Sequence, residues 1–280
     1  MIRILTDSTS DILPQEAGQR GITVVPLRVN FGQESVRDNV DITHQEFYER
    51  LAAAQELPTT SQPTPEDFLP HFEKAREDGD TVICIMLAGS LSGTVQSALI
   101  AKDICGYENI YVVDSTQTVI GLRALVDLAM LLAQQGKSAA EIVSELEQAR
   151  ARVRLYAMVD TLEYLHKGGR LSAAVKVVGT LLKVKPLITL KDGALSVVGK
   201  AMGVKEGQKA LLKLTGEELN NDPRLPVYFG YTCKEAACGQ LRALAEEKYG
   251  LTHTQTHSVG AVIGTHVGPG ATVIAYLEKN

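Results

Sequence analysis

Short runs of β-branched and other apolar residues alternate with segments of helical periodicity through the first half of the chain. This alternation is typical of βαβ units that build a parallel sheet. The expected strands cover residues 2–6, 23–29, 81–87 and 110–114. Thr43 with Glu46, and Ser138 with Glu141, have the spacing of a capping box, so we expect helices to begin after Thr43 and Ser138. A third helix is expected from residue 65.

The pattern changes after about residue 152, where strands follow one another more closely. Segments 155–161, 185–193 and 194–202 read as strands, and Asp192-Gly193 suits a tight hairpin turn between the last two. Further strands are expected at 226–232 and 271–277, with helices near 204–219 and 234–249. We therefore predict an α/β protein of two domains, 1–155 with a mainly parallel sheet and 156–280 with a mixed or antiparallel sheet.

Composition narrows the class of protein and the kind of ligand. The 280 residues include no Trp and only 5% aromatic residues, so a core or a ligand cavity must have mainly aliphatic walls. A net charge of −5 argues against nucleic acid or anionic lipid as the main partner. Four scattered cysteines, and an N-terminus without a secretory pattern, lead us to expect a cytoplasmic protein.

Three hydroxyl-rich segments follow or flank the predicted strands, at 7–11, 59–64 and 89–94. Hydroxyl and backbone N–H donors gathered at one sheet edge could hold a small anion. The alternative is that each Ser or Thr only caps its own helix. Two glycine-rich segments, 167–170 and 264–270, allow a close approach of the backbone to a ligand, or are simply tight turns.

Common catalytic and cofactor motifs are missing from the sequence. It has neither a P-loop nor a G-x-G-x-x-G motif, and His253 with His257 lacks the glutamate of a metalloprotease helix. We therefore predict no metal and no cofactor. Ser92 and His266 occur in the chain order of an α/β-hydrolase, but the segment around Ser92 is not G-x-S-x-G. A serine-dependent acyl hydrolase using Ser92 and His266 stays an alternative.

Six segments, LTDSTSD, TTSQPTPEDF, LSGTVQSA, VVDS, DTLEYLHKGGR and GTHVGPGA, resemble the DegV family of bacterial fatty-acid-binding proteins. The resemblance spans essentially the whole chain. It implies that two α/β domains hold a long-chain fatty acid between them. It further implies a lipid carrier rather than an enzyme, which presents the fatty acid to a fatty acid kinase that makes acyl phosphate for phospholipid synthesis.

The resemblance also assigns candidate residues. The carboxylate of the fatty acid would be bound by Thr60, Ser61, Ser92, Gly93, Thr94 and His266. Arg170, which ends the KGGR segment, would lie at the exposed carboxyl end and engage the kinase. LSGTVQ has valine where the family often has an aromatic residue, and TTSQPT is followed by proline rather than glycine, so the acyl preference stays open.

The remaining expectations concern the tail of the ligand and the partners. Apolar stretches 175–182 and 119–132 could line a tunnel, although most of their positions are better explained as core. We expect a monomer without a nucleic-acid partner, and transient membrane contact is compatible with a lipid carrier. A third reading is that the fold serves another small anion or only a protein partner.

Overall fold

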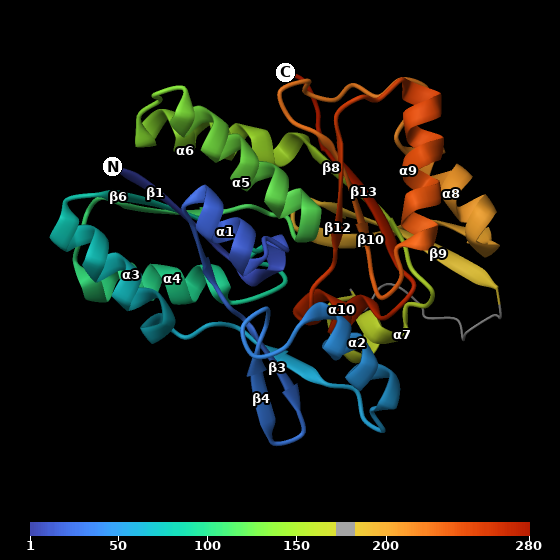
Figure 1. The fold of residues 1–280 in the computed structure, drawn as a ribbon, viewed down its shortest axis with the longest axis horizontal. Coiled ribbons are helices and arrows are strands. Elements are labelled where there is room, and N and C mark those ends of the chain that lie inside the picture. Colours follow the sequence, from blue (N-terminus) through green and yellow to red (C-terminus); the bar gives the residue numbers. More distant parts are fainter. Residues whose placement is uncertain (172–182) are drawn as a thin grey trace.

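The computed structural model describes residues 1–171 and 183–280, and shows two α/β units, each built around its own sheet (Figure 1). The N-terminal unit has a parallel four-stranded sheet in the order β2-β1-β6-β7. Its strands are β2 (Ile22–Val25), β1 (Ile2–Asp7), β6 (Thr81–Met86) and β7 (Ile110–Asp114). The prediction of a mainly parallel N-terminal sheet is confirmed.

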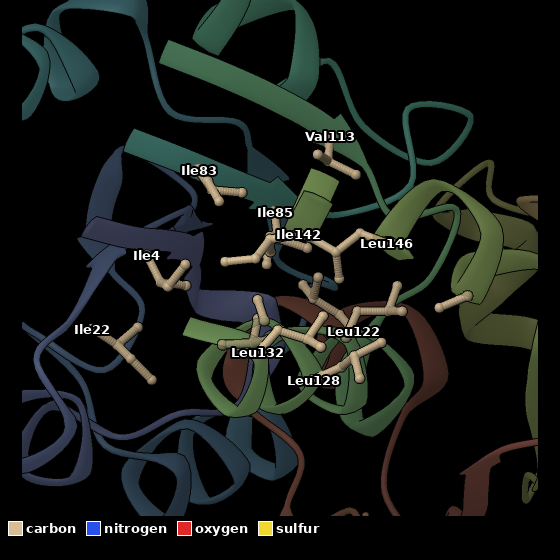
Figure 2. Packing of buried hydrophobic residues seen from close by; sticks show 14 of the residues in the cluster. Ile4, Ile22, Ile83, Ile85, Val113, Leu122, Leu128, Leu132, Ile142 and Leu146 are labelled. Carbon is tan, nitrogen blue, oxygen red and sulfur yellow. The ribbon is translucent and has the colours of Figure 1, made fainter. Parts of the chain in front are cut away.

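Helices cover both faces of this sheet because its strands are apolar on both sides. Leu5 and Cys84 face α3 (Pro65–Asp78) and α4 (Thr94–Cys105), whereas Ile4, Ile83 and Ile85 face the opposite layer. That layer consists of α1 (Pro14–Arg20), α5 (Val119–Gln134) and α6 (Ala139–Ala149), the last followed by a short 3-10 turn (Arg150–Arg152). Figure 2 shows the isoleucines of the sheet packed against leucines of α5 and α6. The capping boxes predicted at Thr43 and Ser138 are both present.

A second, antiparallel sheet in the order β4-β3-β5 was not expected from the sequence. It contains β3 (Arg28–Phe31), β4 (Glu34–Arg37) and β5 (Thr59–Ser61), and α2 (His44–Ala53) connects β4 to β5. The single strand predicted at 23–29 is wrong, because the chain leaves β2 at Val25 and enters β3 at Arg28. Pro26 lies between them and lacks the N–H that would continue the strand ladder.

The C-terminal unit has a mixed six-stranded sheet in the order β10-β9-β8-β13-β11-β12. Its strands are β8 (Val153–Met158), β9 (Val184–Lys191), β10 (Ala194–Met202), β11 (Val227–Tyr231), β12 (Thr254–Ser258) and β13 (Thr272–Leu277). Asp192 and Gly193 both have positive φ, 51° and 76°, as the predicted primed hairpin turn requires. Strand β12 was missed because its polar sequence, TQTHS, has no apolar alternation.

Helices α8 (Gly203–Leu214) and α9 (Ala236–Tyr249) pack on one face of this sheet, while α7 (Glu163–Lys167) and α10 (Ala261–Val267) lie toward the N-terminal unit (Figure 1). Helix α5 contacts both large sheets, which explains why almost all of its positions are apolar. The stretch 119–132 is thus mainly core, and segment 175–182 lies outside the described residues. The domain boundary near residue 155 stays a prediction. None of the described helices is long and apolar enough to cross a membrane.

Candidate ligand cavity and its polar end

A cavity of about 260 Å³ lies between the two units. One wall is a face of the C-terminal sheet, formed by alternate residues of β8 and β9 and by Val273 of β13. Leu155 and Ala157 contribute from β8, and Ile188 and Leu190 from β9, because side chains two residues apart point to the same face of a strand. The cavity therefore uses the sheet surface that α8 and α9 leave uncovered.

The opposite walls come from loops and helix ends of both units. Leu87 and Leu91 follow β6, Val119 begins α5, and Val262 and Ile263 belong to α10. Every apolar side chain among the described lining residues is aliphatic. This agrees with the expectation drawn from the low aromatic content.

Six of the described lining residues carry a hydroxyl group, and three of them come from β5 and the loop after β6. Thr60 and Ser61 come from β5, whose pairing with β3 places Thr60 beside Val29. Ser92 comes from the loop that leads into α4. These three candidates, which lie on two separate segments, thus reach one cavity. Gln62, Thr118, Thr189 and Thr232 also line it, and none of them was a candidate from the sequence.

His266, in the last turn of α10, lies at the same end of the cavity. Its Nε2 is 2.8 Å from the Thr60 hydroxyl, and the side chain is only 8% exposed. Burial, reinforced by the nearby Arg170, lowers the pKa of His266 to about 4. The imidazole is therefore neutral at physiological pH.

Gly168 explains how His266 fits against the loop that follows α7. A Cβ atom on residue 168 would lie 2.3 Å from Nδ1 of His266, well inside van der Waals contact. The backbone of Gly168 has φ −74°, which any residue can adopt. The first glycine of the KGGR segment is therefore needed for close approach, whereas Gly169, with φ +69°, serves a turn.

The two other candidates near Ser92, Gly93 and Thr94, do not line the cavity. Thr94 is fully buried, and its hydroxyl is 2.9 Å from that of Ser92. Gly93 precedes α4, and a Cβ there would collide with the side chain of Gln62 at 2.1 Å. Neither residue is among the lining residues. Thr94 thus orients Ser92, and Gly93 makes room for Gln62.

Arg170 lies at the mouth of the cavity and is exposed. Its Nη1 donates to the carbonyl of Gly168 at 2.7 Å, and its Nε donates to the carbonyl of Leu91 at 3.3 Å. The second bond connects the C-terminal unit to the loop that carries Ser92. In the described part of the chain, Nη2 of this guanidinium has no hydrogen-bond partner.

The first hydroxyl-rich segment does not reach the cavity. Ser8, Thr9 and Ser10 are buried, and their hydroxyls bond to the surrounding protein, for example Ser8 Oγ to the amide of Leu27 at 3.1 Å. The prediction that all three segments share one anion site is wrong in this respect. The short 3-10 turn at Ser8–Ser10 directs these side chains inward instead.

The geometry gives no support to a Ser92–His266 dyad. Within the described chain, Ser92 bonds to Thr94 and His266 bonds to Thr60, with no hydrogen bond between Ser92 and His266. Among the residues that the structure describes, Nδ1 of His266 is buried without a partner, and no carboxylate orients the ring as in a catalytic triad. His257 lies half-buried on β12. No metal-binding group of His, Cys, Asp or Glu occurs among residues 1–171 and 183–280.

Comparison with known protein families shows to which family this chain is related. The family model described as "Uncharacterised protein, DegV family" matches residues 1–279. The chain belongs to the DegV family. A DegV domain-containing protein of Caldanaerobacter subterraneus subsp. tengcongensis is 36% identical over 278 residues, covering 99% of each chain.

Solved DegV structures share the two-unit fold. A DegV family protein from Thermus thermophilus, described by its fatty acid binding, has a TM-score of 0.88 and 36% identity, with 99% of each chain covered. A stearic acid-binding protein from Eubacterium ventriosum has a TM-score of 0.91 and 28% identity, with 100% of this chain and 99% of that one covered. The predicted family and α/β fold are confirmed, and these structural neighbours bind fatty acids.

Proposed function

We propose that this protein binds one long-chain fatty acid in the cavity between its units. The observation that carries the proposal is a cavity with aliphatic walls whose one end is lined by the hydroxyls of Thr60, Ser61 and Ser92. Each buried methylene contributes roughly 0.8 kcal/mol, so about a dozen contribute on the order of 10 kcal/mol before the costs of binding. The fatty acids bound by its structural neighbours support the same ligand class.

The carboxylate would be held by neutral donors. The buried Nδ1 of His266 has no partner within residues 1–171 and 183–280, and an unpaired acceptor is tolerated more readily than an unpaired N–H donor. The ring proton therefore belongs on Nε2, which donates to Thr60 Oγ1. The Thr60 O–H is then free to donate to the ligand carboxylate, alongside Ser61 and Ser92. Hydroxyl donors offset the desolvation of the carboxylate without a buried lysine or arginine that would resist its departure.

We further propose that the protein presents this carboxylate to a fatty acid kinase. The kinase would transfer the γ-phosphoryl group of ATP to a carboxylate oxygen, giving an acyl phosphate for phospholipid synthesis and releasing ADP. Arg170 supports this step because its guanidinium is exposed at the mouth of the cavity and can pair with a phosphate or an acidic surface.

Ligand identity is tested by denaturing protein purified from cells and analysing the released lipid by mass spectrometry. We expect about one fatty acid per chain, and uptake of fatty acid by delipidated protein. Protein that releases no fatty acid and takes up none of several chain lengths would contradict the proposal.

The handover step is tested with Arg170→Ala, using Lys167→Ala as the matched control, because Lys167 is exposed at the end of α7, three residues before Arg170. Arg170→Ala should keep its lipid and melting temperature but lose most acyl-phosphate formation with a cognate kinase and ATP. Lys167→Ala should behave as wild type. Unchanged turnover in Arg170→Ala would refute the handover role, and a joint loss of lipid and stability would assign Arg170 to the Leu91 contact instead.

A further inference from the structure

The sequence motif that the ligand site leaves unused is the segment from Asp7 to Asp11. Its aspartates are buried, with Asp7 0% and Asp11 2% exposed. Asp7 is fully bonded: Oδ1 accepts from Thr9, and Oδ2 accepts from the amide of Leu87 at 2.7 Å. Asp7 thus holds the end of β6. Asp11 points in another direction, toward α10.

Asp11 is joined at the start of α10 by a second buried carboxyl group. Asp11 Oδ1 accepts from the amide of Gly260 at 2.8 Å, and Asp38 Oδ1 accepts from the amide of Ala261 at 3.2 Å. Asp38 is 1% exposed. Both aspartates belong to the N-terminal unit, whereas Gly260 and Ala261 belong to the C-terminal unit. Two consecutive amides at the start of α10 are therefore held across the interface between the units.

The contact at Gly260 is close from several sides. A Cβ on residue 260 would lie 2.9 Å from Nε2 of His44, 3.0 Å from Oδ1 of Asp11 and 3.3 Å from Oδ2 of Asp38. The preceding carbonyl, of Val259, accepts from the Tyr48 hydroxyl at 2.9 Å. The first turn of α10 thus has little freedom to shift relative to the N-terminal unit.

Helix α10 connects this buried contact to the polar end of the cavity. His266 lies five residues after Ala261, a rise of roughly 7–8 Å along a helix. Its bond to Thr60 is a further contact between the same two units. Figure 1 shows α10 beside α2, between the two units. A shift at the start of α10 would therefore be transmitted to the imidazole, because the helix moves as one body.

We propose that Asp11 and Asp38 are positioning residues of the carboxylate site, which fix α10 so that His266 bonds to Thr60. The proposal rests on the proposed fatty-acid binding, and it names two residues that do not line the cavity. Their acceptor oxygens, rather than their bulk, perform this role. Removal of an acceptor should speed release of the bound fatty acid even where the fold is not weakened.

Two substitutions remove the acceptors. Asp11 has φ 56°, which glycine adopts freely, so Asp11→Gly removes the carboxyl and keeps the backbone. Asp38→Leu replaces the buried carboxyl with a larger apolar group of equal heavy-atom count and leaves the amide of Ala261 without its acceptor, so its melting temperature is compared with its release rate. Asp11→Asn and Asp38→Asn keep an Oδ1 acceptor and serve as conservative rescues. Asp80→Ala is the matched control, because Asp80 is 4% exposed but bonds to Arg3, far from α10.

Three quantities are measured on each variant: the release rate of a fluorescent fatty acid, the melting temperature, and the ¹⁵N shift of His266 Nε2 in delipidated protein. Asp11→Gly and Asp38→Leu should release the fatty acid about tenfold faster or more and shift the His266 signal. The Asn variants should stay within about threefold of wild type. Asp80→Ala should lower the melting temperature and leave the other two quantities unchanged.

Each outcome decides one question. Release rates that follow melting temperature across all variants, Asp80→Ala included, would overturn the positioning role. So would an unchanged His266 signal in both Asp11→Gly and Asp38→Leu. A shifted His266 signal in protein that binds no fatty acid would uphold the positioning of His266 and reject the proposed function instead.

Discussion

The side chains of Thr60 and His266, 206 residues apart in the chain, share a hydrogen bond of 2.8 Å across the two units. Thr60 belongs to a strand of the small antiparallel sheet, and His266 belongs to the helix anchored by Asp11 and Asp38. The polar end of the cavity therefore depends on the relative position of the two units, so a change in either unit should affect retention of a ligand carboxylate.

Thr60→Val keeps the shape of the side chain but removes its hydroxyl. Loss of a hydrogen bond to a charged acceptor costs roughly 1.5–3 kcal/mol, so we expect fatty acid to dissociate about ten- to a hundredfold faster. Stopped-flow exchange with a fluorescent fatty acid measures the rate. The control is Thr59→Val, because Thr59 is exposed on the same strand. Equal rates in Thr60→Val and wild type would exclude Thr60 from the site.

Gly168→Ala places a methyl group against the ring of His266. Because the backbone of Gly168 is helical, the expected effect comes from contacts of the added Cβ, which would lie 2.3 Å from Nδ1 of His266 and 3.0 Å from the carbonyl oxygen of Tyr164. The ring should move away from Thr60, and affinity for fatty acid should fall by about tenfold or more. Gly239→Ala, on α9 where a Cβ meets nothing within 4 Å, is the control. A Gly168→Ala crystal structure with His266 undisplaced would show this reading to be wrong.

The hairpin between β9 and β10 is bonded to the Ser92 loop by Ser90, whose Oγ donates to the carbonyl of Gly193 at 2.5 Å. Leu190 and Leu195 of this hairpin line the cavity. One such bond contributes about 1 kcal/mol, so Ser90→Ala should speed fatty-acid exchange by about fivefold. Ser196→Ala, on exposed β10, tests for a nonspecific effect of removing a hydroxyl. Exchange rates that do not differ between these two variants would rule out a fastening role for Ser90.

The pH dependence of stability reports the burial of His266. Its pKa is about 4 in the folded protein and about 6.5 when unfolded, so the unfolded chain takes up the proton first. The associated stability is fully present above pH 6.5 and is lost as pH falls toward 4, roughly 3 kcal/mol in all. His266→Gln should lose less stability over this range in urea titrations. Parallel curves for the two proteins would contradict a buried neutral His266.

The contribution of Asp38 to stability changes with pH in the opposite direction to that of His266. Burial raises the pKa of Asp38 to about 6, above its usual value of 3.8, so the folded protein holds this proton more tightly. Its contribution is present below pH 3.8 and is lost as pH rises through 6, roughly 3 kcal/mol in all. The ionisable groups that surround Asp38 are present in both wild type and Asp38→Asn, so their titration cancels in the comparison. These groups are Asp7, Asp11, His44, Tyr48 and Arg123. Asp38→Asn should therefore gain stability relative to wild type between pH 4 and 7, and a constant difference would refute this.

Local sequence patterns determined most secondary structure. Capping boxes located the starts of α2 and α6, the Asp192-Gly193 pair located a hairpin, and apolar runs located the strands of the parallel sheet. These features depend on neighbouring residues, so they can be read without knowledge of the fold. The short sheet around β3 and the polar strand β12 could not, because their pairing partners, rather than their own periodicity, make them strands.

The sequence by itself also indicated the chemistry, through hydroxyl-rich segments, a glycine-flanked histidine and few aromatic residues. Only the tertiary structure decided which segments meet. It brought Thr60, Ser92 and His266 to one cavity, and it turned the aspartate segment inward to hold α10. The physical reason is that the local sequence does not determine which way a side chain points. A Ser or Asp after a strand has the same sequence neighbours whether it faces a ligand or an amide of another unit. The packing of the two units against α5 and α10 determines which way these side chains face.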